Sequence, residues 1–172
     1  MRECIAEERG LLHRTIDEIM MMFGIPDADY RSIMAYCRRG RTLILVFGLE
    51  ERDGRMVEAV QGYACRTEEG TMLCEGIRLF DDSENAQTLP GRMDFRQLCQ
   101  QYTVVDVGSG AFRPAMIDKQ LSIWFVRQDR QGKILGLKEK KLNAQSGSSG
   151  EADEIYQQLL NMKTPPAGAD KY

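Results

Sequence analysis

The segment TLILVFGLE, residues 42–50, contains apolar side chains at alternating positions. In an extended chain these side chains fall into two sets, which are Leu43, Leu45, Phe47 and Leu49 on one face and Ile44 and Val46 on the other. A repeat of two residues is typical of a pleated strand. The segment therefore predicts a strand with apolar side chains on both faces.

Two further strands follow this one. Asp53-Gly54 favours the positive φ angles of a short hairpin turn, and residues 57–65 then form a second strand. A second turn at residues 67–70 leads into a third strand, residues 72–80. The sequence thus predicts a three-stranded antiparallel meander over residues 42–80. One face of such a meander must be covered, and the neighbouring helical segments are suited to cover it.

Helical patterns precede the meander. Residues 3–23 carry apolar side chains at helical spacing, with Leu11 and Met22 widening the stripe and Met21 on the opposite face. A second, shorter helix is predicted over residues 27–37. Two interpretations of the first helix remain open. It is a core helix with one exposed methionine, or its methionines form an adaptable surface for a partner.

The elements after the meander complete an α+β fold. A polar loop is predicted for residues 81–91, a helix for 93–101 and a strand for 102–107. Residues 121–128 and 133–142 then form a C-terminal hairpin. Lysines in the last strand are typical of charges that protect an edge strand from unwanted pairing; they are Lys138, Lys140 and Lys141.

The chain length of 172 residues suits one domain with a substantial core. We expect residues 1–142 to form this single α+β domain. Residues 143–150 have the composition of a flexible linker. Residues 151–162 predict a C-terminal helix that packs on the same domain, and residues 163–172 predict a disordered tail.

The charge balance argues against two classes of partner. The net charge is −3, so no overall basic field is present to hold a nucleic acid or an anionic membrane. No apolar run approaches the roughly 20 residues that a membrane-spanning helix needs. The N-terminus also lacks a signal-peptide pattern. We therefore expect a cytoplasmic protein that binds neither nucleic acid nor membrane.

The cysteine pattern agrees with a reducing compartment. The five cysteines are odd in number and never follow a Cys-x-x-Cys spacing. Free buried thiols explain them better than disulfides, although Cys65 and Cys74 lie close enough across the second turn for pairing to stay open. The pattern predicts no metal site and no cofactor. The single histidine, His13, has no catalytic partner by motif.

The segment VVDVGSGAF, residues 104–112, resembles the first glycine-rich motif of methyltransferases that use S-adenosylmethionine. Phe112 stands where the third glycine should be, and Arg113-Pro114 interrupts the helix that should follow. A glycine loop between a strand and a bend is therefore the preferred interpretation. An alternative is a small-molecule-binding domain or an enzyme, with a pocket on which the polar groups of Asp106, Ser109 and Arg113 converge.

The order of elements resembles that of the class I type III secretion chaperones. The points of similarity are the helix ending in Phe23-Gly24-Ile25-Pro26, the meander 42–80, Leu89-Pro90, and Gly110-Ala111-Phe112 before the strand 121–128. The resemblance implies a non-catalytic homodimer that holds an unfolded segment of a secreted partner on apolar grooves and sheet edges. It covers most of residues 3–162.

Carried onto this sequence, the resemblance implies two surfaces. The partner-binding groove would include Leu11, Met21 and Met22, and the dimer interface would include Phe95, Leu98 and Trp124. The sequence analysis thus predicts a small acidic protein-binding domain, with the pocket near residues 106–113 as the alternative.

Overall fold

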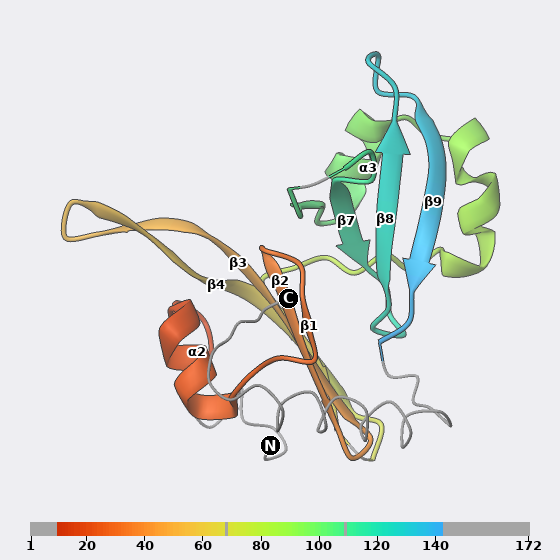
Figure 1. Ribbon diagram of the computed structural model, residues 1–172. Coiled ribbons are helices and arrows are strands. Elements are labelled where there is room, and N and C mark those ends of the chain that lie inside the picture. The colour runs from red at the N-terminus through yellow and green to blue at the C-terminus, as the bar shows by residue number, and fades with distance from the viewer. Residues whose placement is uncertain (1–9, 68, 109, 143–172) are drawn as a thin grey trace, which may run out of the picture. The chain divides into compact units, whose positions relative to one another are not determined.

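The computed structural model describes residues 10–67, 69–108 and 110–142, which contain two antiparallel β-sheets and short helices (Figure 1). The predicted α+β class with antiparallel strands is therefore confirmed. The strands divide into a five-stranded and a four-stranded sheet, so the predicted meander and the predicted C-terminal hairpin belong to different sheets. Ser109, the linker 143–150, the C-terminal helix 151–162 and the tail 163–172 lie outside the described residues.

The first sheet has the strand order β1-β2-β3-β4-β5, and every neighbouring pair is antiparallel. Its strands are β1 (Ala28–Asp29), β2 (Ile33–Arg38), β3 (Arg41–Arg52), β4 (Arg55–Arg66) and β5 (Met72–Glu75). The β3–β4 hairpin extends beyond the other strands of this sheet (Figure 1). Asp53 and Gly54 turn this hairpin with φ angles of 53° and 78°, as the sequence predicts.

The helix predicted for residues 27–37 is wrong, because Ile33–Arg38 forms strand β2. Met34 pairs with Leu45 of β3, and the next residue, Ala35, pairs with Ile44. Side chains of β2 are buried on both faces of the sheet. A short apolar run of this kind does not distinguish helix from strand, and here pairing with β3 decides between them.

The first helix of the described chain is α2 (Ile16–Phe23), and the prediction that residues 10–15 are helical is wrong. Thr15 begins α2 through a capping box with Glu18, in which each side chain accepts from the other residue's backbone N–H. The preceding residues pair with the edge of β4 instead. The N–H of His13 donates to the carbonyl of Val60 at 2.8 Å, and the N–H of Val60 donates to the carbonyl of Arg14 at 2.8 Å.

A first core cluster fills the space between α2 and one face of the first sheet. Its buried members are Leu11, Ile19, Met34, Tyr36, Leu43, Leu45, Phe47, Val60, Tyr63 and Cys65. The hydroxyl of Tyr36 donates to the carbonyl of Gly24 at 2.7 Å and so fixes the end of α2 on the sheet. Ring contact with Phe23 supports the same position.

The register of β4 and β5 excludes the disulfide that the sequence left open. Cys74 lies opposite Ala64, whereas Cys65 lies opposite Leu73. Successive side chains in a strand point to opposite faces, so the two sulfur atoms lie on different sides of the sheet. Neither cysteine forms a disulfide.

The second sheet has the strand order β6-β7-β8-β9, again antiparallel throughout. Its elements in chain order are η1 (Ser83–Gly91), α3 (Phe95–Gln101), β6 (Val105–Asp106), β7 (Pro114–Ile117), β8 (Ile123–Gln128) and β9 (Ile134–Lys140). The sequence analysis predicted no helix or strand in the segment that forms β7. The predicted polar loop 81–91 instead contains the 3₁₀ helix η1, which buries Ala86 and Leu89.

The two faces of the second sheet bury different clusters. One face packs with η1 and α3 in a cluster that includes Phe80, Leu89, Leu98, Met116, Trp124 and Val126. The other face shares a cluster with the first sheet, in which Val105, Ala115 and Ile123 meet Ile33, Ile44 and Ala64. Both faces of the short strands β7 and β8 are therefore occupied near their centres.

Candidate functional site

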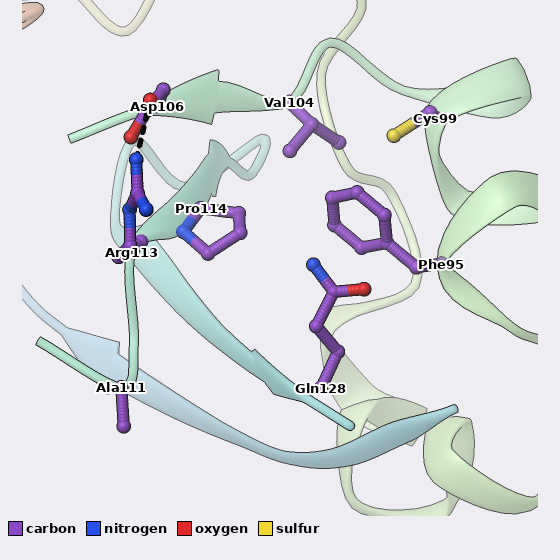
Figure 2. A pocket seen from close by; sticks show the side chains of 8 residues that line it. All are labelled: Phe95, Cys99, Val104, Asp106, Ala111, Arg113, Pro114 and Gln128. Atoms are coloured by element: carbon purple, nitrogen blue, oxygen red, sulfur yellow. Dashed lines mark hydrogen bonds and ion pairs between the residues drawn. The ribbon is translucent and has the colours of Figure 1, made fainter. Parts of the chain in front are cut away.

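A pocket lies between α3 and one face of the second sheet (Figure 2). Its volume is about 500 Å³, and eight residues line it, namely Phe95, Cys99, Val104, Asp106, Ala111, Arg113, Pro114 and Gln128. Pockets of this size hold a small molecule or a few side chains of a partner.

The elements around the pocket explain which side chains reach it. Phe95 and Cys99 are four residues apart on α3 and so lie on the same face of this helix. Asp106 pairs with Pro114 across β6 and β7, which places both side chains on one face of the sheet. Figure 2 shows the α3 residues on one side of the pocket and Pro114 with Gln128 on another.

The lining combines an apolar wall with a few polar groups. Phe95, Val104 and Pro114 belong to the apolar wall. The side-chain amide of Gln128 can both donate and accept a hydrogen bond. Asp106 and Arg113 form an ion pair of 3.1 Å at the rim.

Asp106 is held in its charged form. Its Oδ1 accepts from the N–H of Gly108 at 2.8 Å, and this hydrogen bond is the main reason why the pKa of Asp106 lies below its usual value. The hydrogen bond and the positive charge of Arg113 lower this pKa further, as does the charge of Arg31. The carboxylate is therefore ionised at neutral pH.

A glycine at position 108 allows Arg31 to approach the pocket rim. Gly108 has a φ of 80°, and a Cβ there would lie 2.2 Å from Nη1 of Arg31. Any larger residue would push this guanidinium away. Gly108 thus allows both the turn after β6 and the close approach of the Arg31 side chain. The adjoining strand β6 is antiparallel to β7, unlike the parallel strand of the methyltransferase motif.

Cys99 is a neutral thiol in this setting. Burial raises its pKa, and the nearby charge of Arg78 opposes the rise only in part. The guanidinium of Arg78 is engaged in hydrogen bonds to α3, where it donates to the carbonyl of Gln100 at 2.7 Å and of Cys99 at 3.3 Å. A protonated thiol is a poor nucleophile, so Cys99 acts as a small apolar group in the wall.

Comparison with protein-family models, with curated proteins and with solved structures gives no match to this chain. The function must therefore be inferred from the geometry of the molecule.

The structure brings together two of the three residues that the sequence analysis assigned to a pocket. Asp106 and Arg113 both line the pocket, while Ser109 lies outside the described residues. The remaining lining residues were not predicted as pocket residues. The apposition of α3 to β6 and β7 creates this cavity, and no local pattern in the sequence signals it.

The three residues assigned to a partner groove differ in how far their side chains are exposed. Leu11 is only 1% exposed and belongs to the first core cluster, so it offers no surface. Met22 is half-buried against the same cluster. Met21 is 87% exposed on α2 and is the one of the three with a fully accessible side chain.

The residues assigned to a dimer interface are mostly internal. Leu98 and Trp124 are buried within the cluster between α3 and the second sheet, so neither presents a surface to a second copy. Phe95 is half-buried and lines the pocket. Burial of these side chains within one chain is sufficient to explain their apolar character.

A second polar cluster surrounds Glu50 on the β3–β4 hairpin. His13 Nδ1 lies 2.9 Å from Glu50 Oε1, Gln61 donates to the same oxygen at 3.0 Å, and Arg52 binds Oε2 at 2.9 Å. These contacts lower the pKa of Glu50 to about 2, the bond with His13 being the largest cause. The cluster ties the segment before α2 to the hairpin, which is a structural role.

Residues 10–67, 69–108 and 110–142 contain no group of three His, Cys, Asp or Glu side chains arranged to hold a metal ion. None of the helices within these ranges is long and apolar enough to cross a membrane.

Proposed function

We propose that this protein is a non-catalytic binding domain that holds a short segment of a partner polypeptide. An apolar side chain of the segment enters the pocket between α3 and the second sheet. The observation that carries the proposal is the lining itself, which combines the apolar wall of Phe95, Val104 and Pro114 with the amide of Gln128.

The polar groups of the pocket suit a peptide backbone. The amide of Gln128 presents one donor and one acceptor side, which matches the N–H and C=O of a peptide unit. The ion pair of Asp106 and Arg113 adds a charged acceptor and charged donors at the rim. Recognition of extended segments combines backbone hydrogen bonds with pockets for individual side chains.

The ionisation states also support binding over proton transfer. A general acid or base works best when its pKa lies near the operating pH. The pKa of Asp106 is lowered and that of Cys99 is raised, so both are moved away from neutrality. Each group keeps one charge state while a ligand binds.

The resemblance to class I type III secretion chaperones stays a prediction, as do the homodimer and the cytoplasmic location. The proposal shares with that resemblance the capture of a partner segment. It differs in the surface used, because Leu11 and two residues assigned to the dimer interface are buried.

A phage-displayed library of random peptides provides the test. Peptides selected on the wild-type protein are synthesised with a fluorescent label, and their affinity is measured by fluorescence anisotropy. Ala111→Trp places an indole ring in the pocket, from the exposed loop that holds Ala111. Gln128→Leu removes the side-chain amide. We expect each variant to weaken binding about tenfold, which corresponds to the loss of roughly one good contact.

Matched controls separate the pocket from general effects. Gln87→Trp adds the same ring on the exposed side of η1, and Gln131→Leu removes an amide in the exposed β8–β9 turn. Both should keep the wild-type affinity and melting temperature. Selected peptides that bind the pocket variants as tightly as the wild type would rule out the proposed site.

A small-molecule ligand is the second candidate, supported by a pocket volume of about 500 Å³. A fragment library screened by thermal shift tests it. A compound that raises the melting temperature of the wild type, but not of Arg113→Ala or Ser109→Ala, would favour this candidate over a peptide.

A further inference from the structure

Two cations converge on one aromatic ring at the end of the second sheet. The guanidinium carbon of Arg127 lies 5.8 Å from the centre of the Phe112 ring, and Nζ of Lys138 lies 6.0 Å from it. Both distances fall within the range of cation–π attraction. Phe112 thus holds two like charges close together, although they repel each other.

The strand register places a third cation on the same face. Lys138 pairs with Phe125 and Lys140 pairs with Ile123, while Arg127 lies two residues beyond Phe125. Paired residues share a face, so Arg127, Lys138 and Lys140 project from one side of β8 and β9. All three side chains are exposed, and we call them the basic face. It is opposite to the face that packs with α3, on the same side as Ile123 and Phe125, which pack with the first sheet. None of its three residues lines the pocket.

The charges of the basic face have no carboxylate partner within the described chain. Arg113 and Lys119 pair with Asp106 and Asp81, but no carboxylate among the described residues forms an ion pair with any member of the basic face. Residues 104–142 contain eight Lys and Arg against four Asp and Glu. Of those four, Asp118 is buried and Asp106 is already paired, so the local excess of positive charge is real.

Protection of an edge strand explains only part of this arrangement. Lysines on an exposed edge discourage pairing with other chains, and β9 is an edge strand of its sheet. Arg127 lies on β8, whose pairing with β7 ends at Phe125, so edge protection also accounts for its charge. Edge protection does not require the convergence of Arg127 and Lys138 on Phe112, which brings two like charges together.

We propose that the basic face docks an acidic segment of a partner polypeptide. Lys138 and Lys140 are two residues apart on one strand, which corresponds to about 6.8 Å. An extended segment with carboxylates at alternate positions has the same spacing, so its charges can meet both lysines, and Arg127 binds a further carboxylate. This surface is separate from the pocket and functions whether or not the pocket binds a peptide.

The structure favours an acidic polypeptide over a nucleic acid. Proteins that bind single strands offer open aromatic rings on which bases stack, whereas Arg127 and Lys138 cover the ring of Phe112. Residues 10–103 also carry fifteen acidic against eleven basic residues, which repel a long polyanion. A short acidic segment confined to the basic face avoids this repulsion.

The probe is a fluorescein-labelled peptide of roughly eight residues that alternates Glu and Thr, the length of one strand. Its binding to the full-length protein is followed by fluorescence anisotropy at low salt. The triple variant Arg127→Gln/Lys138→Gln/Lys140→Gln should bind about tenfold more weakly, because three exposed ion pairs each contribute a fraction of 1 kcal/mol. The same peptide with Gln in place of Glu should not bind.

A matched variant removes an equal charge elsewhere. Arg55→Gln/Arg96→Gln/Lys119→Gln leaves the basic face intact and should keep the affinity within about twofold of wild type. Gln128→Leu should also retain the acidic peptide, so failure of the pocket and failure of the basic face give different results. If the triple variant unfolds, Lys138→Gln alone replaces it and should still weaken binding.

Three results would overturn the proposal. The first is that the acidic peptide fails to bind the wild-type protein. The second is that the two triple variants lose affinity equally, because this would indicate general charge attraction. The third is that an oligothymidylate of equal charge binds the basic face more tightly than the peptide does, because this would assign the surface to nucleic acid.

Discussion

The carboxylate of Asp118 accepts a hydrogen bond of 2.7 Å from the indole Nε1 of Trp124, and both side chains are buried. The other carboxylate oxygen accepts from the backbone N–H groups of Ser122 and Gln120, at 2.8 Å and 3.0 Å. One carboxylate therefore closes the turn between β7 and β8. It also orients the ring that fills the cluster under α3.

Removal of this carboxylate should be among the most destabilising single changes in the second sheet. Asp118→Ala leaves the indole N–H and two backbone N–H groups without an acceptor. We expect a loss of about 3–5 kcal/mol in the free energy of unfolding, since hydrogen bonds to charged groups are strong and buried donors are costly to leave unpaired. Chemical denaturation measures the loss. A loss below about 1 kcal/mol would show that water replaces the carboxylate.

A double-mutant cycle isolates the bond between the two side chains. Trp124→Phe removes the indole N–H and some side-chain volume. Asp118→Asn replaces the carboxylate with an amide, which has one oxygen to accept hydrogen bonds instead of two. The combined variant should lose about 1–2 kcal/mol less than the sum of the two single losses. Additive losses would mean that the two groups do not interact in solution.

The cluster around Glu50 predicts a pH dependence. Hydrogen bonds from His13 and Gln61 lower the pKa of Glu50 from its ordinary 4.5 to about 2. A lowered pKa means that the ionised carboxylate stabilises the folded state fully above pH 4.5. This contribution is lost as the pH falls from 4.5 through about 2.

Glu50→Gln should therefore lower the urea midpoint at pH 7, and the difference from wild type should shrink as the pH approaches 2. Glu58→Gln is the control, because Glu58 is exposed on the same hairpin and its carboxylate forms no hydrogen bond within the described residues. A midpoint difference for Glu50→Gln that is constant with pH would contradict the assigned pKa.

Substitution of Gly108 should cost more than substitution of Gly110. Both have positive φ angles, so alanine at either position costs about 1 kcal/mol of backbone strain. Only at Gly108 does the new Cβ meet Arg31, whose flexible side chain must then move aside. We expect a loss of about 1.5–2 kcal/mol for Gly108→Ala in chemical denaturation. Equal losses at the two glycines would show that Arg31 does not occupy this position in solution.

The two adjacent methionines of α2 should respond differently to charge. Met21→Glu alters a fully exposed side chain and should change the free energy of unfolding by less than about 0.5 kcal/mol. Met22→Glu places a carboxylate against the first core cluster and should cost about 1–3 kcal/mol. Thermal and chemical melting of both variants, with Met21→Ala as a control for lost side-chain volume, checks the difference. Equal stability would place Met22 at the surface.

The sequence predicted elements whose signals are local. The alternation of residues 42–50 identified β3, and Asp53-Gly54 identified the turn that follows, because side-chain period and positive φ depend on neighbouring residues alone. The helix predicted near residues 93–101 appears as α3, which begins after the capping residue Asp94. These features need no knowledge of what packs against them.

The tertiary structure decided everything that depends on a partner distant in sequence. Pairing with β3 made a strand of Ile33–Arg38, and pairing with β8 made one of Pro114–Ile117. The cover of η1 and α3 buried Leu98 and Trp124, which by sequence alone were candidates for a surface. The pocket and the basic face arise in the same way, because each joins side chains from separate elements that the sequence does not show to be neighbours.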